Sequence, residues 1–494
     1  MTEWLSRAAA SPPVPRPGES LPAGSNSLSA APAPDRRAGG RGTTAAGLRR
    51  SLDASCAEGM VAEVCGACAG GAVLTAWAIH AGADARTIGL LGALPLAAQV
   101  LQLPAARLTR RFGCRRVGIA AIGASRLVWL PLALVVFAEP PRAILLPLLV
   151  LVVAIAAVLG VVGNNAWISW MGDLVPAHLR GRFFGRRTAL LSIAGTIASL
   201  TVGFVLDTLG SRGLGAETLS ALAGIACVAG GASIALLLRH ADPGAAPPPA
   251  GPRRDTVSAV LRDPVARPFL VYLLAWNGAV GLSAGFFSFH MLGTLQTGFT
   301  LAAAHGVVVA CARIVSAPLW GRVVDGAGAR PVVQLCSLGI AFVPALWLVA
   351  TPDRIWPLAI EAVLAGVFWS GHGIATLDLT IGSSPRAARP AYTAVFAAAG
   401  GIGFAATSVL AGALAAAVTP PLQALGAGWT GLHALFALSA IARLAASLLC
   451  ARIAERGARG VDAVLDALAA EVVALSASVL ALAGVQKRSV RPSA

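Results

Sequence analysis

The stretch GDLVPAHLRGRFFGRR, residues 172–187, is strongly basic, with four arginines between Arg180 and Arg187. It separates two apolar runs, LLPLLVLVVAIAAVLGVVG (145–163) and TALLSIAGTIASLTVGFVL (188–206). A helix of about 20 residues crosses the roughly 30 Å hydrocarbon core of a bilayer, and each run is close to that length. A basic strip between two such runs is typical of a short loop at an anionic membrane surface.

The composition of the whole chain supports a membrane setting. Of 494 residues, 56% are hydrophobic and 12% are charged, and the mean hydropathy is +0.75. Soluble domains have about 25% charged residues, so we expect the lipid bilayer to be the main partner of this surface. The net charge is +16, and nearly all of the positive charge comes from arginine side chains. Because the basic residues lie in short strips between apolar runs, we expect no nucleic-acid partner.

The cysteines are scattered along the chain, and one pair forms a CxxC. Cys65 and Cys68 lie inside an apolar run, without a second pair or a histidine in range. We therefore interpret them as small buried hydrophobic side chains and expect no metal site.

Apolar runs of spanning length recur along the chain and predict an all-α membrane protein with twelve transmembrane helices in two six-helix bundles. The predicted spans are 57–80, 87–108, 117–138, 143–170, 187–208, 215–239, 269–292, 300–321, 331–350, 355–379, 391–417 and 430–451. The predicted domains are a disordered tail (1–56), a first bundle (57–239), a cytoplasmic linker (240–268), a second bundle (269–451) and a tail (452–494) with a surface helix over 461–484.

Arginines gather on alternate loops of this scheme. One set of loops carries them at 107–116, 180–187, 239–267, 322–330 and 386–389, whereas the other set has only Arg86, Arg142, Arg212 and Arg354. Basic residues that flank spans stay on the cytoplasmic side. We therefore expect both termini, and the 172–187 loop, in the cytoplasm, with the protein in a bacterial inner membrane.

The two halves contain an internal repeat. PAHLRGRF, from Pro176, aligns with PRAARPAY, from Pro385. A second pair of similar loops follows the second and the eighth span, namely ARLTRRFGCRR (106–116) and GRVVDGAGAR (321–330).

On these loops the chain resembles the major facilitator superfamily of secondary transporters. The family signature is Gly, three residues, Asp, two residues, Gly, one residue and Arg, and the second copy is complete. It consists of Gly321, Asp325, Gly328 and Arg330. The first copy is degraded, because Ala106 replaces the first glycine and Arg110 the aspartate. It retains Arg111, Gly113 and Arg115. The 172–187 loop is similar to a poorly characterised bacterial subgroup.

The resemblance implies two rocking bundles around a central cavity, with substrate near the midplane. A sharp turn accounts for glycine at 321 and 328. Asp325 can face a helix N-terminus or an arginine. We hypothesise that it contacts the start of the fifth span, at Arg182, Arg186 and Arg187, in the outward-open state. The alternative is a simple turn with a solvated carboxylate.

Ionisable and polar residues inside spans are costly and mark candidate sites for substrate or coupling. The candidates are Glu63, Arg126, Asn164, Asn165, Asn277, Arg313, Glu361 and His372. Glu63 and Glu361 are the candidates for carrying a proton. Arg126 and Arg313 are candidates for holding an anionic group of the substrate or for pairing with an acid. The alternative is structural, with Arg126 in an ion pair and Arg313 bonded to carbonyl groups. The asparagines and His372 serve helix packing equally well.

We therefore predict a secondary transporter that moves a small organic solute, with proton-coupled efflux as the first hypothesis and proton-coupled uptake of a polar or anionic metabolite as the alternative. We expect a monomer without a cofactor, driven by the proton gradient. A membrane-embedded enzyme or sensor is the third possibility. It lacks support, because the sequence has no HExxH, nucleophile elbow or phosphate loop. Substrate, direction and coupling ion do not follow from the sequence.

Overall fold

The computed structural model of the protein describes residues 45–138, 140–175, 180–241, 256–385, 388–424, 429–455 and 457–482. These residues are overwhelmingly helical, and the one β-type pairing described among them joins Thr351 to Arg354. Eleven helices are long and apolar enough to cross a membrane, and the shorter apolar helix Ala85–Leu101 stands where the second span is expected. The twelve-helix fold predicted from the sequence is confirmed.

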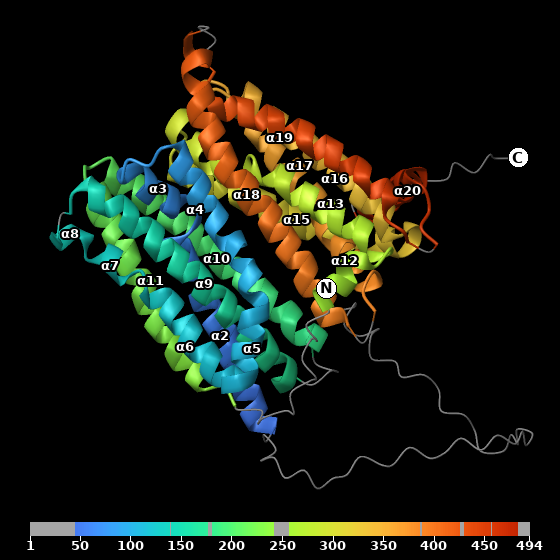
Figure 1. Ribbon diagram of the computed structural model, residues 1–494, viewed down its shortest axis with the longest axis horizontal. Coiled ribbons are helices and arrows are strands. Elements are labelled where there is room, and N and C mark those ends of the chain that lie inside the picture. Colours follow the sequence, from blue (N-terminus) through green and yellow to red (C-terminus); the bar gives the residue numbers. More distant parts are fainter. Residues whose placement is uncertain are drawn as a thin grey trace, which may run out of the picture. The chain divides into compact units, whose positions relative to one another are not determined.

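The first half of the fold (Figure 1, blue to green) contains six spans. Its elements are α2 (Ala45–Ala69), α3 (Gly71–His80), α4 (Ala85–Ala97), η1 (Ala98–Leu101), α5 (Gln102–Phe112), α6 (Cys114–Leu127), α7 (Leu130–Ala133), α8 (Val135–Ala138), α9 (Arg142–Leu174), α10 (Arg180–Gly210) and α11 (Gly215–Leu238).

The second half (Figure 1, yellow-green to red) follows the short helix α12 (Thr256–Arg262). Its elements are α13 (Ala266–Gly281), η3 (Ala284–Phe286), α14 (Phe287–Phe289), the π-helix η4 (His290–Thr294), α15 (Phe299–Ala327), α16 (Ala329–Val349), α17 (Trp356–Gly382), α18 (Arg389–Ala424), α19 (Gly431–Leu448), η5 (Leu449–Arg452) and α20 (Val461–Leu482).

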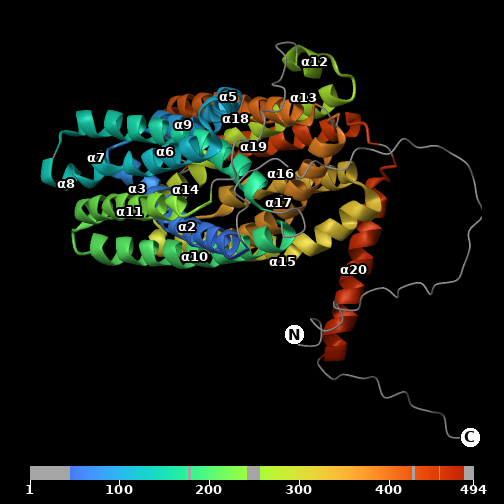
Figure 2. The same ribbon diagram turned by 90° about the horizontal axis from the view of Figure 1, so that it is seen from below.

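The spans run back and forth between two ends of the bundle. We call the end at which α5, α9, α15 and α17 finish the arginine-rich end, because the basic loops lie there, and we call the other the opposite end. In Figure 2, α8 marks the opposite end and α20 the arginine-rich end. Large apolar side chains such as Phe137, Phe204 and Val315 are exposed on the outer faces of the spans, as expected for contact with lipid.

The two halves meet along two seams, where α4 packs against α18 and α10 packs against α15. Glycines allow the backbones to approach closely. A Cβ atom at Gly89 would lie 2.4 Å from the carbonyl oxygen of Ser408, and one at Gly203 would lie 2.7 Å from that of Phe299. The Ser408 hydroxyl also donates to the carbonyl of Gly89. Both seams are tightest toward the opposite end.

The first and the seventh span, which correspond to each other in the repeat, are both interrupted. The first breaks between α2 and α3 at Gly70 and Gly71, and Gly71 has a φ of +51°. The seventh changes from α13 through η3 and α14 to the π-helix η4. Irregular backbone within a membrane is tolerated where it is covered by protein or lines a cavity.

The repeated signature loops form matching turns between helices. Gly113 joins α5 to α6 with a φ of +88°, and Gly328 joins α15 to α16 with a φ of +96°. Both conformations favour glycine. Gly321 is different, because it lies within α15 at a helical φ and not at the turn. The turn explanation therefore holds for Gly328 and is wrong for Gly321.

The predicted tail boundary at residue 56 is also corrected. Helix α2 begins at Ala45, and its first turns are anchored by the buried residues Ser51, Ser55 and Cys56. The Ser51 hydroxyl accepts a hydrogen bond from the backbone of Ala241. Residues 1–44, 242–255 and 483–494 lie outside the described part of the chain.

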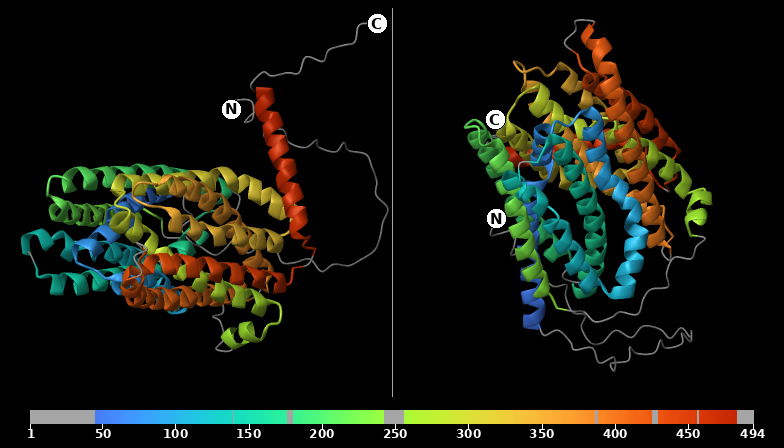
Figure 3. Two further views of the ribbon diagram at one scale, coloured as in Figure 1. Left: turned by 90° about the horizontal axis from the view of Figure 1, so that it is seen from above. Right: turned by 60° about the vertical axis from the view of Figure 1, so that its left-hand side comes forward.

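The C-terminal helix α20 lies at the arginine-rich end and runs crosswise to the spans (Figures 2 and 3). Val464 is buried among residues of the second half, and Glu471 pairs with Arg322 of α15. A helix is present where the sequence predicts a surface helix, and it packs against α15 and α16.

Candidate functional site

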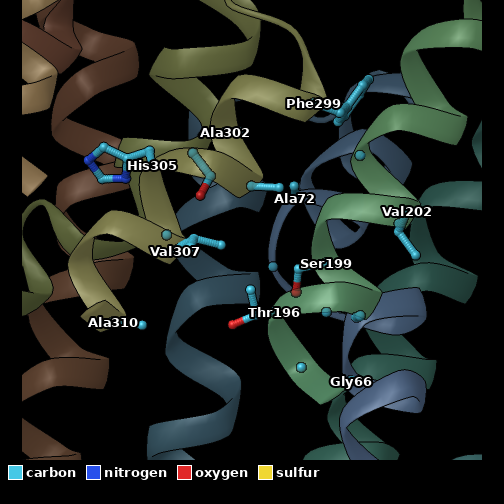
Figure 4. Close-up of a pocket in the computed structure, with 18 of the residues that line it drawn as sticks. Gly66, Ala72, Thr196, Ser199, Val202, Phe299, Ala302, His305, Val307 and Ala310 are labelled. Carbon is cyan, nitrogen blue, oxygen red and sulfur yellow. The ribbon is translucent and has the colours of Figure 1, made fainter. Parts of the chain in front are cut away.

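A cavity of about 720 Å³ lies between the two halves. The first half contributes α2, α3 and α10, and the second contributes residues from α14 to α17. Figure 4 shows Thr196 and Ser199 of α10 on one side, and Ala302 and His305 of α15 on the other. The interrupted first and seventh spans both line the cavity, through Gly70 and Gly71 on one side and through Phe287 and Met291 on the other.

The charged and titratable side chains of the lining are few. They are Glu63 from the first half, and His305, Glu361 and the thiol of Cys311 from the second. The hydroxyl groups are supplied mainly by α10, at Thr188, Ser192, Thr196 and Ser199. The two candidates for carrying a proton, Glu63 and Glu361, both line this cavity.

Glu63 lies on α2, about two turns before the break in the first span at Gly70 and Gly71. It forms no hydrogen bond or ion pair within the described residues. A Cβ atom at Gly195 of α10 would lie only 2.9 Å from its Oε2 atom. The glycine therefore makes room for the carboxylate, and the carboxylate is free to take a proton or a ligand.

Glu361 and His305 form a pair across α17 and α15. The Nε2 atom of His305 lies 2.5 Å from Oε2 of Glu361, and the side chains are 18% and 5% exposed. A hydrogen bond joins the imidazole to the carboxyl group at this distance. The buried Arg443 supports Glu361 electrostatically from behind and donates hydrogen bonds to Ser283 and to the carbonyl of Ile340. His305 is not among the site candidates predicted from the sequence.

A second polar cluster lies nearer the arginine-rich end of the first half, outside the cavity lining. Glu58 of α2 is 2.8 Å from Arg126 and 3.7 Å from Arg187, and it accepts a hydrogen bond from Ser233. The guanidinium of Arg187 also lies 4.4 Å from the centre of the Trp167 ring. Arg126 is thus held in an acid pair, as one of the two sequence hypotheses expected.

Glu58 is the residue that sequence reasoning missed. It falls at the edge of the predicted first span, where a carboxylate is expected to be in contact with water. Its two partners come from α6 and α10, and their approach depends on the packing of three helices. The one available signal was an acid close to an apolar run that also contains Glu63.

The remaining candidates are distributed over the fold. His372 is buried, accepts or donates a hydrogen bond with Tyr272 at 2.8 Å and stacks on Trp276, so it serves packing. Asn277 donates to the carbonyl of Leu273 and faces the close approach of Gly400. Asn164, Asn165 and Arg313 are absent from the cavity lining. Arg313 is exposed on α15, one turn beyond Ala310 toward the arginine-rich end.

The signature residues lie at the arginine-rich end. Asp325 is exposed, and Arg186 and Arg187 contact Asp53 and Glu58 of their own half. Arg115 donates to the carbonyl of Leu238 at the end of α11. Arg111 lies over the ring of Phe112. The side chains of Arg180 and Arg182 lie outside the described part of the chain. At Arg330, the backbone N–H donates to Glu455, which thereby caps α16.

The opposite end of the cavity is closed by a contact between the halves. Asp207, near the end of α10, accepts hydrogen bonds from the backbone N–H groups of Phe299 and Thr300 at 2.7 Å and from the Thr300 hydroxyl at 2.6 Å. A carboxylate at the N-terminus of α15 satisfies unpaired donors and is favoured by the helix dipole. Around it, Val73 and Leu206 belong to the same buried apolar cluster as Phe286 and Met291.

Comparisons with known proteins point in one direction. No curated sequence matches the chain. Among solved structures, the nucleoside transporter NupG is 12% identical with a TM-score of 0.60, and the alignment covers 83% of this chain and 100% of that one. A D-xylose-proton symporter is also 12% identical, with a TM-score of 0.61 and coverage of 81% and 97%.

A third neighbour is a bacterial homologue of the human lysosomal transporter Spinster, in an inward-facing, unoccupied conformation. It is 14% identical with a TM-score of 0.55, over 88% of this chain and 98% of that one. These likenesses establish the fold. A family model described as Major Facilitator Superfamily matches residues 60–408. The chain therefore belongs to the Major Facilitator Superfamily and is a multi-pass membrane transporter.

Proposed function

We propose that the protein is a proton-coupled secondary transporter that moves a small organic solute by alternating access, with efflux in exchange for protons as its main mode. The observation that carries the proposal is one cavity that contains Glu63 from the first half and the His305–Glu361 pair from the second. A proton bound to either carboxylate changes the charge between the halves, and so changes their preferred arrangement.

The coupling groups have distinct roles in this proposal. Glu63 has no partner in the described structure, so it binds a proton without breaking an existing contact. Glu361 is hydrogen-bonded to His305 and interacts electrostatically with Arg443, so a change of charge on this pair is felt within the second half. The reaction cycle uses the proton gradient and no cofactor.

We also propose that the arginine-rich end faces the cytoplasm, following the distribution of basic residues. The structure then represents the inward-open arrangement, because the Asp207 contact closes the opposite end. The inward-facing Spinster homologue among the structural neighbours is consistent with this assignment. In the alternative arrangement, Asp325 approaches the start of α10 and holds the arginine-rich end closed.

The Asp325 contact is tested by the reactivity of a cysteine at Gly326, which is exposed beside it. Asp325→Asn weakens the outward-open state, so the rate of labelling from the cytoplasmic side rises. An unchanged rate rejects the latch. The matched variant Asp353→Asn changes an exposed carboxylate at the opposite end and leaves the rate unaltered.

Flux into proteoliposomes with an imposed pH gradient tests the function. A panel of amines, organic acids, sugars and nucleosides is offered to the purified protein, and flux of at least one solute follows the gradient. Glu63→Gln and Glu361→Gln retain exchange of solute for solute but lose accumulation driven by protons. Glu217→Gln, at an exposed site in the first turn of α11, behaves as wild type. Gradient-independent flux, or full coupling in both cavity variants, contradicts the proposal.

A further inference from the structure

The charge lining the cavity is acidic or neutral. Glu63 and Glu361 supply carboxylates, and His305 supplies an imidazole already engaged with Glu361. The guanidinium groups closest to these acids are occupied elsewhere. Arg187 contacts Glu58 and the Trp167 ring, and Arg443 is buried behind Glu361, where it contacts Ser283 and Ile340. An anion entering the cavity therefore meets carboxylates and no free guanidinium in its lining.

Apart from the hydroxyl groups of α10, the remaining lining is mostly apolar and partly aromatic. Phe287, Phe299 and Trp347 line the side formed by the second half, and Met291 lies beside them. The Phe287 and Trp347 rings are 4.7 Å apart. Aromatic faces attract cations, and they do so more strongly when water is excluded. Methionine adapts to ligands of different shape.

The wall formed by the first half leaves room for a bulky ligand. Gly66, Gly70, Gly71 and Ala72 carry almost no side-chain volume, and they stand at the break in the first span. Glu63 lies one turn from Gly66 and about two turns from Gly70, and it lines the same cavity. The unpaired carboxylate and the open space are therefore next to each other.

Taking the proposed transport function as given, we infer that this cavity binds a lipophilic organic cation, such as a quaternary phosphonium or ammonium ion or a protonated aromatic amine. The positive charge provides the partner that Glu63 lacks, and the aromatic substituents occupy the side lined by Phe287 and Phe299. A delocalised or shielded charge suits the site better than a small ammonium ion, because it loses less hydration energy on entering an apolar cavity.

This ligand class also explains exchange with protons. A proton and a cation compete for the carboxylate of Glu63, because each neutralises it. Arg187 is the cation that acts on Glu63 electrostatically, Arg443 is the cation that acts on Glu361, and the titratable imidazole of His305 faces Glu361. Acidification therefore weakens binding of the cation, whereas it strengthens binding of an anion.

The probe is tetraphenylphosphonium, with tetraphenylborate as an ion of the same shape and opposite charge. Binding of labelled tetraphenylphosphonium to the full chain in detergent is measured by equilibrium dialysis against empty micelles, at about pH 8 and about pH 5. Glu63→Gln is the principal variant, because Glu63 has no described partner that its loss would leave unpaired. Glu217→Gln is the control, and Cys311 labelling in the presence of each ion reports occupancy of the cavity independently.

We expect tetraphenylphosphonium to bind at about pH 8, to protect Cys311, to bind more weakly at about pH 5, and to bind roughly tenfold or more weakly in Glu63→Gln. Tetraphenylborate neither competes nor protects. The inference is overturned if tetraphenylborate binds as tightly as the phosphonium, or if Glu63→Gln leaves binding unchanged. Because the transport proposal is judged by gradient-driven flux of any solute, a failure here leaves that result standing, and the two failures are distinguishable.

Discussion

At the scale of single residues, Glu58 is the carboxylate that holds three elements of the first half together. It is 3% exposed and compensates Arg126 and Arg187 at once. Removal of one partner from a buried ion pair destabilises by about 3–5 kcal/mol, because the remaining charge is left without compensation. We expect Glu58→Gln to lower the free energy of unfolding by about that amount, measured by thermal or denaturant unfolding in detergent.

Asp53 provides the matched control for Glu58. Its pair with Arg186 spans 3.5 Å and both side chains are more than half exposed. An exposed pair contributes at most about 1 kcal/mol, so Asp53→Asn has a small effect. If the free energy of unfolding falls equally in the two variants, Glu58 is not the main stabilising residue of the cluster.

Only part of the candidate site could be predicted from the sequence. Acids within apolar runs are rare enough to be noticed, and so Glu63 and Glu361 could be named. Their neighbours could not, because a pair such as His305 with Glu361 depends on the rotation of two helices that are distant in sequence. His372 could be noticed but not assigned, since burial against Tyr272 and Trp276 is a property of the packed structure.

At the scale of helices, two carboxylates cap helix N-termini in the same way but in different places. Asp207 of the first half caps α15 of the second, whereas Glu455 caps α16 within the second half. Loss of such a cap costs about 1–2 kcal/mol, which corresponds to roughly a 5–30-fold change in population. Only the Asp207 cap is broken when the opposite end opens.

We therefore expect Asp207→Ala to raise the rate at which an impermeant maleimide reaches Cys311 from the opposite-end side, roughly 5–30-fold. Cys311 is exposed and lines the cavity. Glu455→Ala loses a cap of the same kind and lowers unfolding stability, but leaves this rate unchanged. An equal increase in both variants would mean that general loosening, and not the seam, controls access.

The contact between Asp263 and Tyr392 ties the segment before α13 to the start of α18. The Tyr392 hydroxyl donates to the Asp263 carboxylate at 2.7 Å, and this hydrogen bond is the main cause that lowers the pKa of Asp263 below its ordinary value of 3.8. A lowered pKa means that the stabilisation is fully present above about pH 4 and is lost as the pH falls through the pKa of the folded state.

Tyr392→Phe is thus expected to lower the unfolding temperature near neutral pH and to differ less from wild type as the solution is acidified below about pH 4. The difference is measured as a series of melting curves against pH. In an Asp263→Asn background the same substitution has an effect that does not vary with pH. A pH-independent difference in the wild-type background would exclude the carboxylate as the relevant partner.

At the scale of the whole molecule, the spans, their number and the division into halves were predictable. Membrane thickness fixes the length of a span, and a hydrophobic run of that length has few alternatives. The start of α2 at Ala45 was missed, because residues 45–56 lack a long apolar run and are stabilised by packing against α9 and the segment after α11. The breaks in the first and seventh spans were missed too, since glycine is common throughout these helices.

The seams and the cavity could not be predicted from the sequence, for a different reason. In the proposed alternating-access cycle they depend on which of two arrangements the halves adopt, and the same residues serve both. Asp325 illustrates this, since its predicted contact belongs to an arrangement other than the one seen. The conformational cycle is therefore best tested by a direct measurement of how the two halves are arranged.

The most direct measurement is the distance between the halves at both ends of the bundle in one preparation. Spin labels at Arg111 and Gly326 report on the arginine-rich end, and labels at Arg212 and Asp353 report on the opposite end; all four positions are exposed. With the native cysteines replaced, double electron–electron resonance is recorded between about pH 5 and pH 8. The account predicts that the two distances change in opposite senses, one end closing as the other opens. Distances that stay fixed, or that lengthen together, would contradict it.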